Sequence, residues 1–112
     1  RKVLKEIAAF LQAHPEIKKI KIVGHTDARG RSKRNLILSR QRAETVRELL
    51  IKEGVAPERI VTDGKGDAEP IASNRTRKGR AQNRRIVMTI EELEAGKALD
   101  TRIDPANPNP AP

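Results

Sequence analysis

The residues best suited to chemistry lie between Gly24 and Leu50, where a single aspartate precedes a run of arginines. The segment reads GHTDARGRSKRNLILSRQRAETVRELL, with Asp27 in a polar loop and Arg42 about two turns into the helix expected to follow. A carboxylate can hold a ligand ammonium group, and a guanidinium can bind a ligand carboxylate through two parallel hydrogen bonds. If the loop folds back over the helix start, these side chains form opposite ends of a small pocket for a zwitterion. Free amides at the helix N-terminus would favour the same carboxylate.

A simpler interpretation of the same two residues stays open. Asp27 can cap a turn within its loop, and Arg42 can form a surface ion pair worth ~0–1 kcal/mol. Spacing alone favours this simpler interpretation over the zwitterion pocket.

No other group of side chains is sufficient for catalysis or metal binding. His14, His25 and Asp27 are too few for a zinc site, which takes three or four ligands with supporting contacts, and the chain has no cysteine. We expect His25 to hydrogen-bond within its own turn. Ser39 and Ser73 lie outside a G-x-S-x-G motif, and the segment DGKGD lacks the ending of a phosphate-binding loop. The sequence therefore predicts a protein that is not an enzyme and holds no metal or cofactor.

The charge of the chain indicates an anionic partner. Its 112 residues carry a net charge of +9, and the first 92 carry 22 cationic and 12 anionic residues, a net +10. Nucleic acid, anionic lipid or an acidic polymer would each fit this charge. Phe10 is the only aromatic residue, so the stacking platforms typical of single-strand nucleic-acid binders are missing. No apolar run approaches the ~18–20 residues of a membrane span.

Hydrophobic periodicity predicts helices at residues 1–14, 35–53 and 76–82, and strands at residues 17–24, 59–63 and 85–92. Buried faces are expected at Ile20 and Ile22 in the first strand, at Leu36, Ala43, Val46 and Leu50 in the long helix, and at Ile86, Met88 and Ile90 in the last strand. Gly54 suits a left-handed helix end. This order of elements predicts a two-layer α/β sandwich. We expect one folded domain over residues 1–92 and a proline-rich tail or linker over residues 93–112.

Three stretches of the chain resemble the OmpA-like peptidoglycan-binding family. IKIVGHTDARG is similar to the family's strand and G-H-T-D-x-x-G loop, and NLILSRQRAETVRELLIKEGV is similar to its N-x-x-L-S-x-x-R-A helix. ERIVTDGKGDAEPIASNRTRKGRAQNRRIVMTI resembles its R-I-x-x-x-G-x-G, P-I-x-x-N-x-T and N-R-R segments. Together these stretches cover roughly residues 3–91.

The resemblance implies an α+β fold, with a mixed sheet and helices packed on one face. It also implies non-covalent binding of the diaminopimelate residue of the wall stem peptide. The family's aspartate and arginine that grip the free amino-acid end of diaminopimelate match Asp27 and Arg42. Asn35 matches a polar neighbour at the pocket rim, and Arg84 matches a basic residue near the same mouth.

The sequence departs from the family pattern in two places. Arg34 stands where the family usually has an aromatic residue before the asparagine. The family's first strand precedes its first helix, and we expect that strand to lie upstream of Arg1.

The sequence therefore predicts a periplasmic domain that anchors an outer-membrane or envelope protein to peptidoglycan, with any membrane attachment outside this chain. The main alternative is a basic domain that binds nucleic acid or another polyanion. It predicts binding that weakens steeply with salt and is indifferent to Asp27. A wall hydrolase would need a catalytic set that the sequence lacks. Binding of other envelope proteins through the tail or a helix face is compatible with wall binding.

Overall fold

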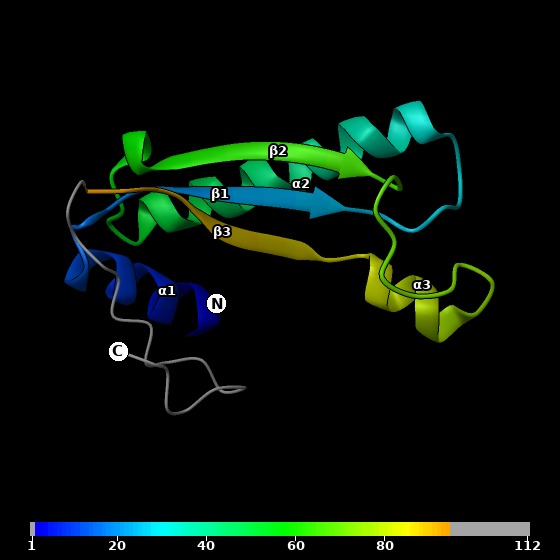
Figure 1. Ribbon diagram of the computed structural model, residues 1–112, viewed down its shortest axis with the longest axis horizontal. Coiled ribbons are helices and arrows are strands. Elements are labelled where there is room, and N and C mark those ends of the chain that lie inside the picture. The colour runs from blue at the N-terminus through cyan, green and yellow to red at the C-terminus, as the bar shows by residue number, and fades with distance from the viewer. Residues whose placement is uncertain (1, 95–112) are drawn as a thin grey trace.

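The computed structural model describes residues 2–94 (Figure 1). Its helices are α1 (Lys2–Ala13), α2 (Ser32–Lys52) and α3 (Arg77–Asn83), with a 3-10 turn, η1 (Pro57–Arg59), before the second strand. Its strands are β1 (Ile17–His25), β2 (Ile60–Gly66) and β3 (Ile86–Leu93). Every predicted helix and strand is therefore present, and α2 begins three residues earlier than expected. Most of the predicted tail, residues 95–112, lies outside the described residues.

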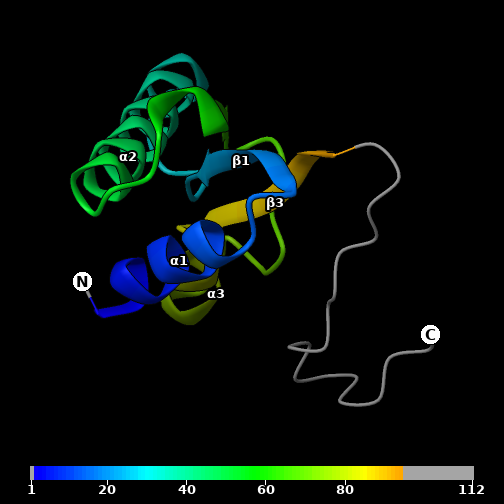
Figure 2. The same ribbon diagram turned by 90° about the vertical axis from the view of Figure 1, so that its left-hand side faces the viewer.

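The three strands form one mixed sheet in the order β2-β1-β3. The central strand β1 runs parallel to β2 and antiparallel to β3, and Ile20 of β1 lies opposite Ile60 and Ile90. The turned view shows α1 and α2 on the same side of this sheet (Figure 2). The predicted α+β class, with a mixed sheet and helices on one face, is confirmed.

The hydrophobic core lies between the sheet and the two long helices. Its buried members are Ala8, Leu11, Ile17, Ile20, Ile22, Ala43, Leu50, Val55 and Ile60. Gly54 has a φ of +104° directly after α2, which confirms the predicted left-handed helix end. The amide of Val55 then donates to the carbonyl of Leu50 at 3.1 Å, so the chain turns back towards the sheet within three residues of the helix.

Two glycines allow α2 to approach the sheet more closely than side chains would permit. A Cβ at Gly24 in β1 would collide with the carbonyl oxygen of Ser39, and a Cβ at Gly64 in β2 would lie 2.5 Å from the amide nitrogen of Arg40. The hydroxyl of Ser39 also accepts a hydrogen bond from the amide of Gly66 at 2.9 Å. The start of α2 is therefore fixed against the ends of β1 and β2 by backbone contact.

This close contact explains why one predicted buried position is wrong. Leu36 was expected on the sheet-facing row of α2, but its side chain is 46% exposed. Asn35 and Ser39 occupy the buried row instead, where the helix backbone lies close to Gly24, Gly64 and Gly66. Leu50, further along the same helix, is fully buried as predicted.

A second correction concerns the last strand. Ile86 and Met88 pack on the core as predicted, but Ile90 is 40% exposed. Ile90 lies opposite the buried Ile20, yet β3 is an edge strand of the sheet described by residues 2–94. A side chain there has a neighbouring strand on one side only.

Within residues 2–94, no helix combines the length and apolar character that crossing a bilayer requires.

Replacing Leu50 should test the assigned core. We expect Leu50→Ala to lower the free energy of unfolding by ~2–5 kcal/mol, because it leaves a cavity beneath α2. Leu36→Ala removes the same atoms from an exposed position of the same helix and should change it by less than ~0.5 kcal/mol. Urea titrations of both variants measure the difference. Equal losses for the two would show that the buried face of α2 is misassigned.

Candidate functional site

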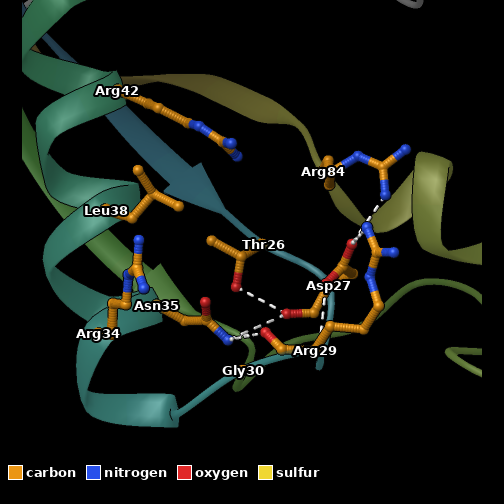
Figure 3. A pocket seen from close by; sticks show the side chains of 9 residues that line it. All are labelled: Thr26, Asp27, Arg29, Gly30, Arg34, Asn35, Leu38, Arg42 and Arg84. Carbon is orange, nitrogen blue, oxygen red and sulfur yellow. Dashed lines mark hydrogen bonds and ion pairs between the residues drawn. The ribbon is translucent and has the colours of Figure 1, made fainter.

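An open cavity of about 400 Å³ lies where β1 ends, between the loop that follows this strand and the side of α2 (Figure 3). All four residues predicted to bind a ligand line it: Asp27, Asn35, Arg42 and Arg84. The other lining residues are Thr26, Arg29, Gly30, Arg34 and Leu38. The fold thus brings together side chains from three separate segments of the chain. Their contact with a ligand stays a prediction.

The carboxylate of Asp27 is buried and held by arginines. Its Oδ2 accepts from Arg84 Nη1 at 2.7 Å and lies 3.4 Å from Arg29 Nη2. Its Oδ1 accepts from the backbone amide of Arg29 at 2.9 Å. A carboxylate offers about four lone-pair positions, so one position on Oδ1 is left for a further donor.

Asn35 holds the loop that carries Asp27. Its Nδ2 donates to the carbonyl of Arg29 at 3.0 Å and to the carbonyl of Asp27 at 3.3 Å. Both amide hydrogens of this buried side chain therefore point at loop backbone (Figure 3). Asn35 lines the cavity as predicted, but it lies beneath the loop and braces it, whereas the sequence placed it at the pocket rim.

A second set of hydrogen bonds holds the same loop through Asn74, which precedes α3, and Asn83, the last residue of α3. The side chain of Asn83 is fully buried, and its Oδ1 accepts from the amides of Ile71 and Ala72 at 2.8 and 3.0 Å. Its Nδ2 donates to Asn74 Oδ1 at 2.8 Å, and that same oxygen accepts from the amide of Ala28 at 3.1 Å. Asn83, which directly precedes Arg84, is thus connected through Asn74 to the loop of Asp27.

Arg42 differs from Arg29 and Arg84, the two arginines that contact Asp27. Within residues 2–94 its guanidinium forms no hydrogen bond or ion pair, and Figure 3 shows it extended from α2 into the space above Thr26. The simpler sequence interpretation is confirmed for Asp27, which caps its own turn by accepting from the Arg29 amide. Its other half, a surface ion pair for Arg42, is wrong for residues 2–94. Arg42 remains available to bind a ligand anion.

The cavity lies along the side of α2 and not beyond its N-terminal end. Arg34, Asn35, Leu38 and Arg42 share one lateral face of the helix. At the helix start, the hydroxyl of Ser32 donates to the carboxylate of Asp67 at 3.1 Å instead. Ser32 and Lys33, the first two residues of α2, are not among the residues that line the cavity.

The electrostatics of the cavity keep Asp27 ionised. Burial would raise the pKa of this carboxyl, but hydrogen bonds from the Arg29 amide and from the Arg84 and Arg29 guanidinium groups outweigh burial and lower it to about 2. Four guanidinium groups and one carboxylate line the cavity, a net charge of +3. The cavity therefore suits a ligand that is negative overall and carries one cationic group.

The sequence missed two features of this region. Arg29 and Arg34 line the cavity, and their only sequence signal was membership of the arginine run after Asp27.

His25 was expected to form a hydrogen bond within its turn. Instead it ends β1, is 3% exposed, and its Nδ1 has no hydrogen-bond partner among residues 2–94. Burial and, secondarily, the charge of Arg85 lower the pKa of His25, so its ring is neutral at neutral pH.

The structure is a small α+β domain with an open, arginine-rich cavity beside one buried aspartate. Among residues 2–94, no three histidine, cysteine or acidic side chains are grouped closely enough to hold a metal ion. The chain belongs to the OmpA family, whose family model matches residues 1–84.

Named proteins similar to this chain come from several bacteria. The probable lipoprotein YiaD of Escherichia coli is 44% identical over 78% of this chain, and the peptidoglycan-binding protein ArfA of Mycobacterium tuberculosis is 42% identical over 79% of it. Among solved structures, the peptidoglycan-associated lipoprotein from Burkholderia pseudomallei is 36% identical, with a TM-score of 0.74 over 79% of this chain and 74% of its own. The chain spans 39% of YiaD and 27% of ArfA, so it corresponds to one part of these longer proteins.

The ion pairs of Asp27 should make stability depend on pH in a specific way. A pKa lowered to about 2 from 3.8 stabilises the fold at pH values above about 4. This contribution, on the order of 2 kcal/mol, is lost as the pH falls from about 4 towards 2. Asp27→Asn lacks the titrating group. We therefore expect the wild type to have a higher free energy of unfolding than Asp27→Asn at neutral pH. This difference should shrink as the pH falls from about 4 towards 2.

Urea titrations between pH 2.5 and pH 7 measure this difference, with Asp67→Asn as a control for a carboxylate outside the cavity. Other carboxylates titrate in both proteins and cancel in the comparison. A gap between wild type and Asp27→Asn that stays constant with pH would contradict the buried ion pairs.

Proposed function

We propose that this domain binds peptidoglycan non-covalently by gripping the free amino-acid end of diaminopimelate in the wall stem peptide. The observation that carries the proposal is the placement of Asp27 and of Arg42, whose guanidinium is unpaired within residues 2–94, in one cavity. The free end of diaminopimelate is a zwitterion, with an ammonium group and a carboxylate on one carbon. The two side chains present the complementary charges.

The ammonium group of the ligand binds Asp27. This carboxylate keeps one lone-pair position on Oδ1, and the 3.4 Å contact with Arg29 is its longest. The Arg29 side chain is 67% exposed and can turn into solvent when the ammonium arrives. Arg84, at 2.7 Å, stays in place and keeps the carboxylate ionised.

The carboxylate of the ligand binds Arg42. A guanidinium offers two parallel donors that match both oxygens of a carboxylate, which a lysine ammonium cannot do. Leu38, on α2, and Thr26, in the loop, also line the cavity. They provide a surface for the aliphatic part of the amino acid.

The single acid gives the site its selectivity. A cavity lined only by arginines would accept any carboxylate and repel a neighbouring ammonium group. Asp27 makes the ammonium favourable, so a zwitterion is preferred over a ligand with a carboxylate alone. The net charge of +9 attracts the anionic wall polymer over a longer range.

The names of similar proteins support this proposal. ArfA is described as a peptidoglycan-binding protein and the Burkholderia protein as a peptidoglycan-associated lipoprotein. We infer that this domain works in the periplasm without catalytic activity, and that it anchors an outer-membrane or envelope protein to the wall through a segment outside this chain. Binding of nucleic acid or of another polyanion through the basic surface is the alternative.

Replacing Asp27 separates the two candidate functions, because they predict opposite changes in binding affinity. Asp27→Asn keeps the size of the side chain and raises the net charge from +9 to +10. A zwitterion site should lose ~1.5–3 kcal/mol of binding free energy, the worth of a hydrogen bond to a charged group. A polyanion binder should bind as well or better. Cosedimentation with purified diaminopimelate-type sacculi at physiological salt measures the affinity.

Asp67→Asn is the matched control for this experiment. It makes the same change in charge outside the cavity and should leave wall binding unchanged. Circular dichroism shows that both variants are folded. If the folded wild type stays in the supernatant, or if both variants bind the wall more tightly, the proposed function is wrong.

A further inference from the structure

A second cavity adjoins the first and has a different chemical character. It has a volume of about 350 Å³ and is lined by His25, Arg42, Arg84, Arg85 and Ile86. Arg42 and Arg84 line both cavities, so the two are neighbouring parts of one surface depression. A ligand held between Asp27 and Arg42 therefore has direct access to this second space.

The charge of the second cavity is unbalanced. Three guanidinium groups line it and no carboxylate does. Arg85 donates to the carbonyls of Glu69 and Asn83 at 2.9 and 3.3 Å, which fixes its position without neutralising its charge. Arg84 is paired with Asp27 on the side of the first cavity. Within residues 2–94, Arg42 and Arg85 have no anionic partner.

His25 adds a polar group that lacks a partner. The residue is 3% exposed and lines the second cavity, and its Nδ1 makes no hydrogen bond among residues 2–94. A buried polar atom without a hydrogen bond destabilises the fold unless a ligand or solvent supplies the missing partner. A ligand oxygen bound in this cavity would lie among three cationic donors and beside this imidazole.

We infer that the cavity of His25, Arg42, Arg84 and Arg85 is an anion subsite for a second carboxylate of the same wall peptide. This inference rests on the proposed function, because the diaminopimelate end places the peptide. The glutamate of the stem peptide is joined through its γ-carboxyl group, which leaves its α-carboxylate free, and the peptide ends in another free carboxylate. Either group supplies the chemistry that the subsite recognises.

The subsite also accounts for the excess positive charge around the zwitterion pocket. A zwitterion has no net charge and cannot balance the +3 of the first cavity. Each further carboxylate on the ligand balances one of these guanidinium groups or that of Arg85. Because the two cavities adjoin and share Arg42 and Arg84, one peptide that carries both carboxylates can place one in each cavity and gain both sets of contacts.

Synthetic stem peptides test the inference without altering the protein. Calorimetry should compare four tetrapeptides that contain diaminopimelate: one unmodified, one with the glutamate α-carboxylate amidated, one with the C-terminal carboxylate amidated, and one with both amidated. We expect one single amidation to weaken binding about tenfold and the other to have little effect, which identifies the source. The doubly amidated peptide should match the weaker of the two. Kd values within twofold for all four would overturn the subsite.

Arg85→Gln tests the protein side, with Lys78→Gln as its control. Lys78 is exposed on α3 and loses the same charge. Arg85→Gln should bind the unmodified peptide about tenfold more weakly and should no longer distinguish it from the sensitive amide. Arg85→Lys keeps the charge and should recover part of this discrimination. Discrimination that persists in a folded Arg85→Gln, or is lost equally in Lys78→Gln, would overturn the subsite.

Failure of the subsite and failure of the proposed function give different results. If the wild type binds the diaminopimelate peptide but ignores amidation, the zwitterion site stands and only the subsite is wrong. If it binds none of the four peptides, the proposed function itself is wrong. If a single-stranded oligonucleotide displaces the peptide from the wild type and itself binds Arg85→Gln more weakly, the second cavity is part of a general polyanion surface.

Discussion

The backbone contact between Ser39 of α2 and the glycines of β1 and β2 sets the position of every group in the cavity. Because Gly24 and Gly64 have no Cβ, the helix lies directly against the ends of two strands. Its first turns then stand beside the loop that leaves β1. Asn35, one turn before Ser39, reaches the loop carbonyls, and Arg42, almost one turn after Ser39, reaches the cavity. A larger residue at either glycine would push both groups away from Asp27.

The second constraint is the balance of charge around Asp27. A buried carboxylate is costly unless it is paired, and here the Arg29 amide and two guanidinium groups hold it. These contacts keep the acid ionised and leave Arg42 unpaired within residues 2–94. The arginines that stabilise the buried Asp27 carboxylate also give both cavities an excess of positive charge. A ligand that is anionic overall would balance this excess.

Much of the fold could be predicted from the sequence because its signals are local. Apolar periodicity and Gly54 after the long helix identify the elements. The sequence also identified the four residues that the fold brings to one cavity, through resemblance to a family. Spacing alone could not do so, because the position of Arg84 beside Asp27 depends on a contact across 57 residues.

The errors in the sequence interpretation have physical causes that only the assembled structure reveals. Leu36 fits the apolar row of its helix, but the glycines opposite that row leave room for Asn35 and Ser39. Ile90 alternates correctly along its strand, but the exposure of β3 depends on its place at the edge of the described sheet. His25 looked like a turn residue, because nothing in its local sequence indicates that the strand ends in a buried position, where the His25 amide donates to the carbonyl of Arg85.

The most direct test of this account is the affinity for two soluble stem peptides that differ at one residue. One peptide contains diaminopimelate, and the other contains lysine, which lacks the second carboxylate but keeps the amine. Calorimetry on the wild type should show tighter binding of the diaminopimelate peptide by about tenfold or more, and Arg42→Lys should reduce that ratio towards one. Equal affinity for both peptides in the wild type would contradict a zwitterion gripped between Asp27 and Arg42.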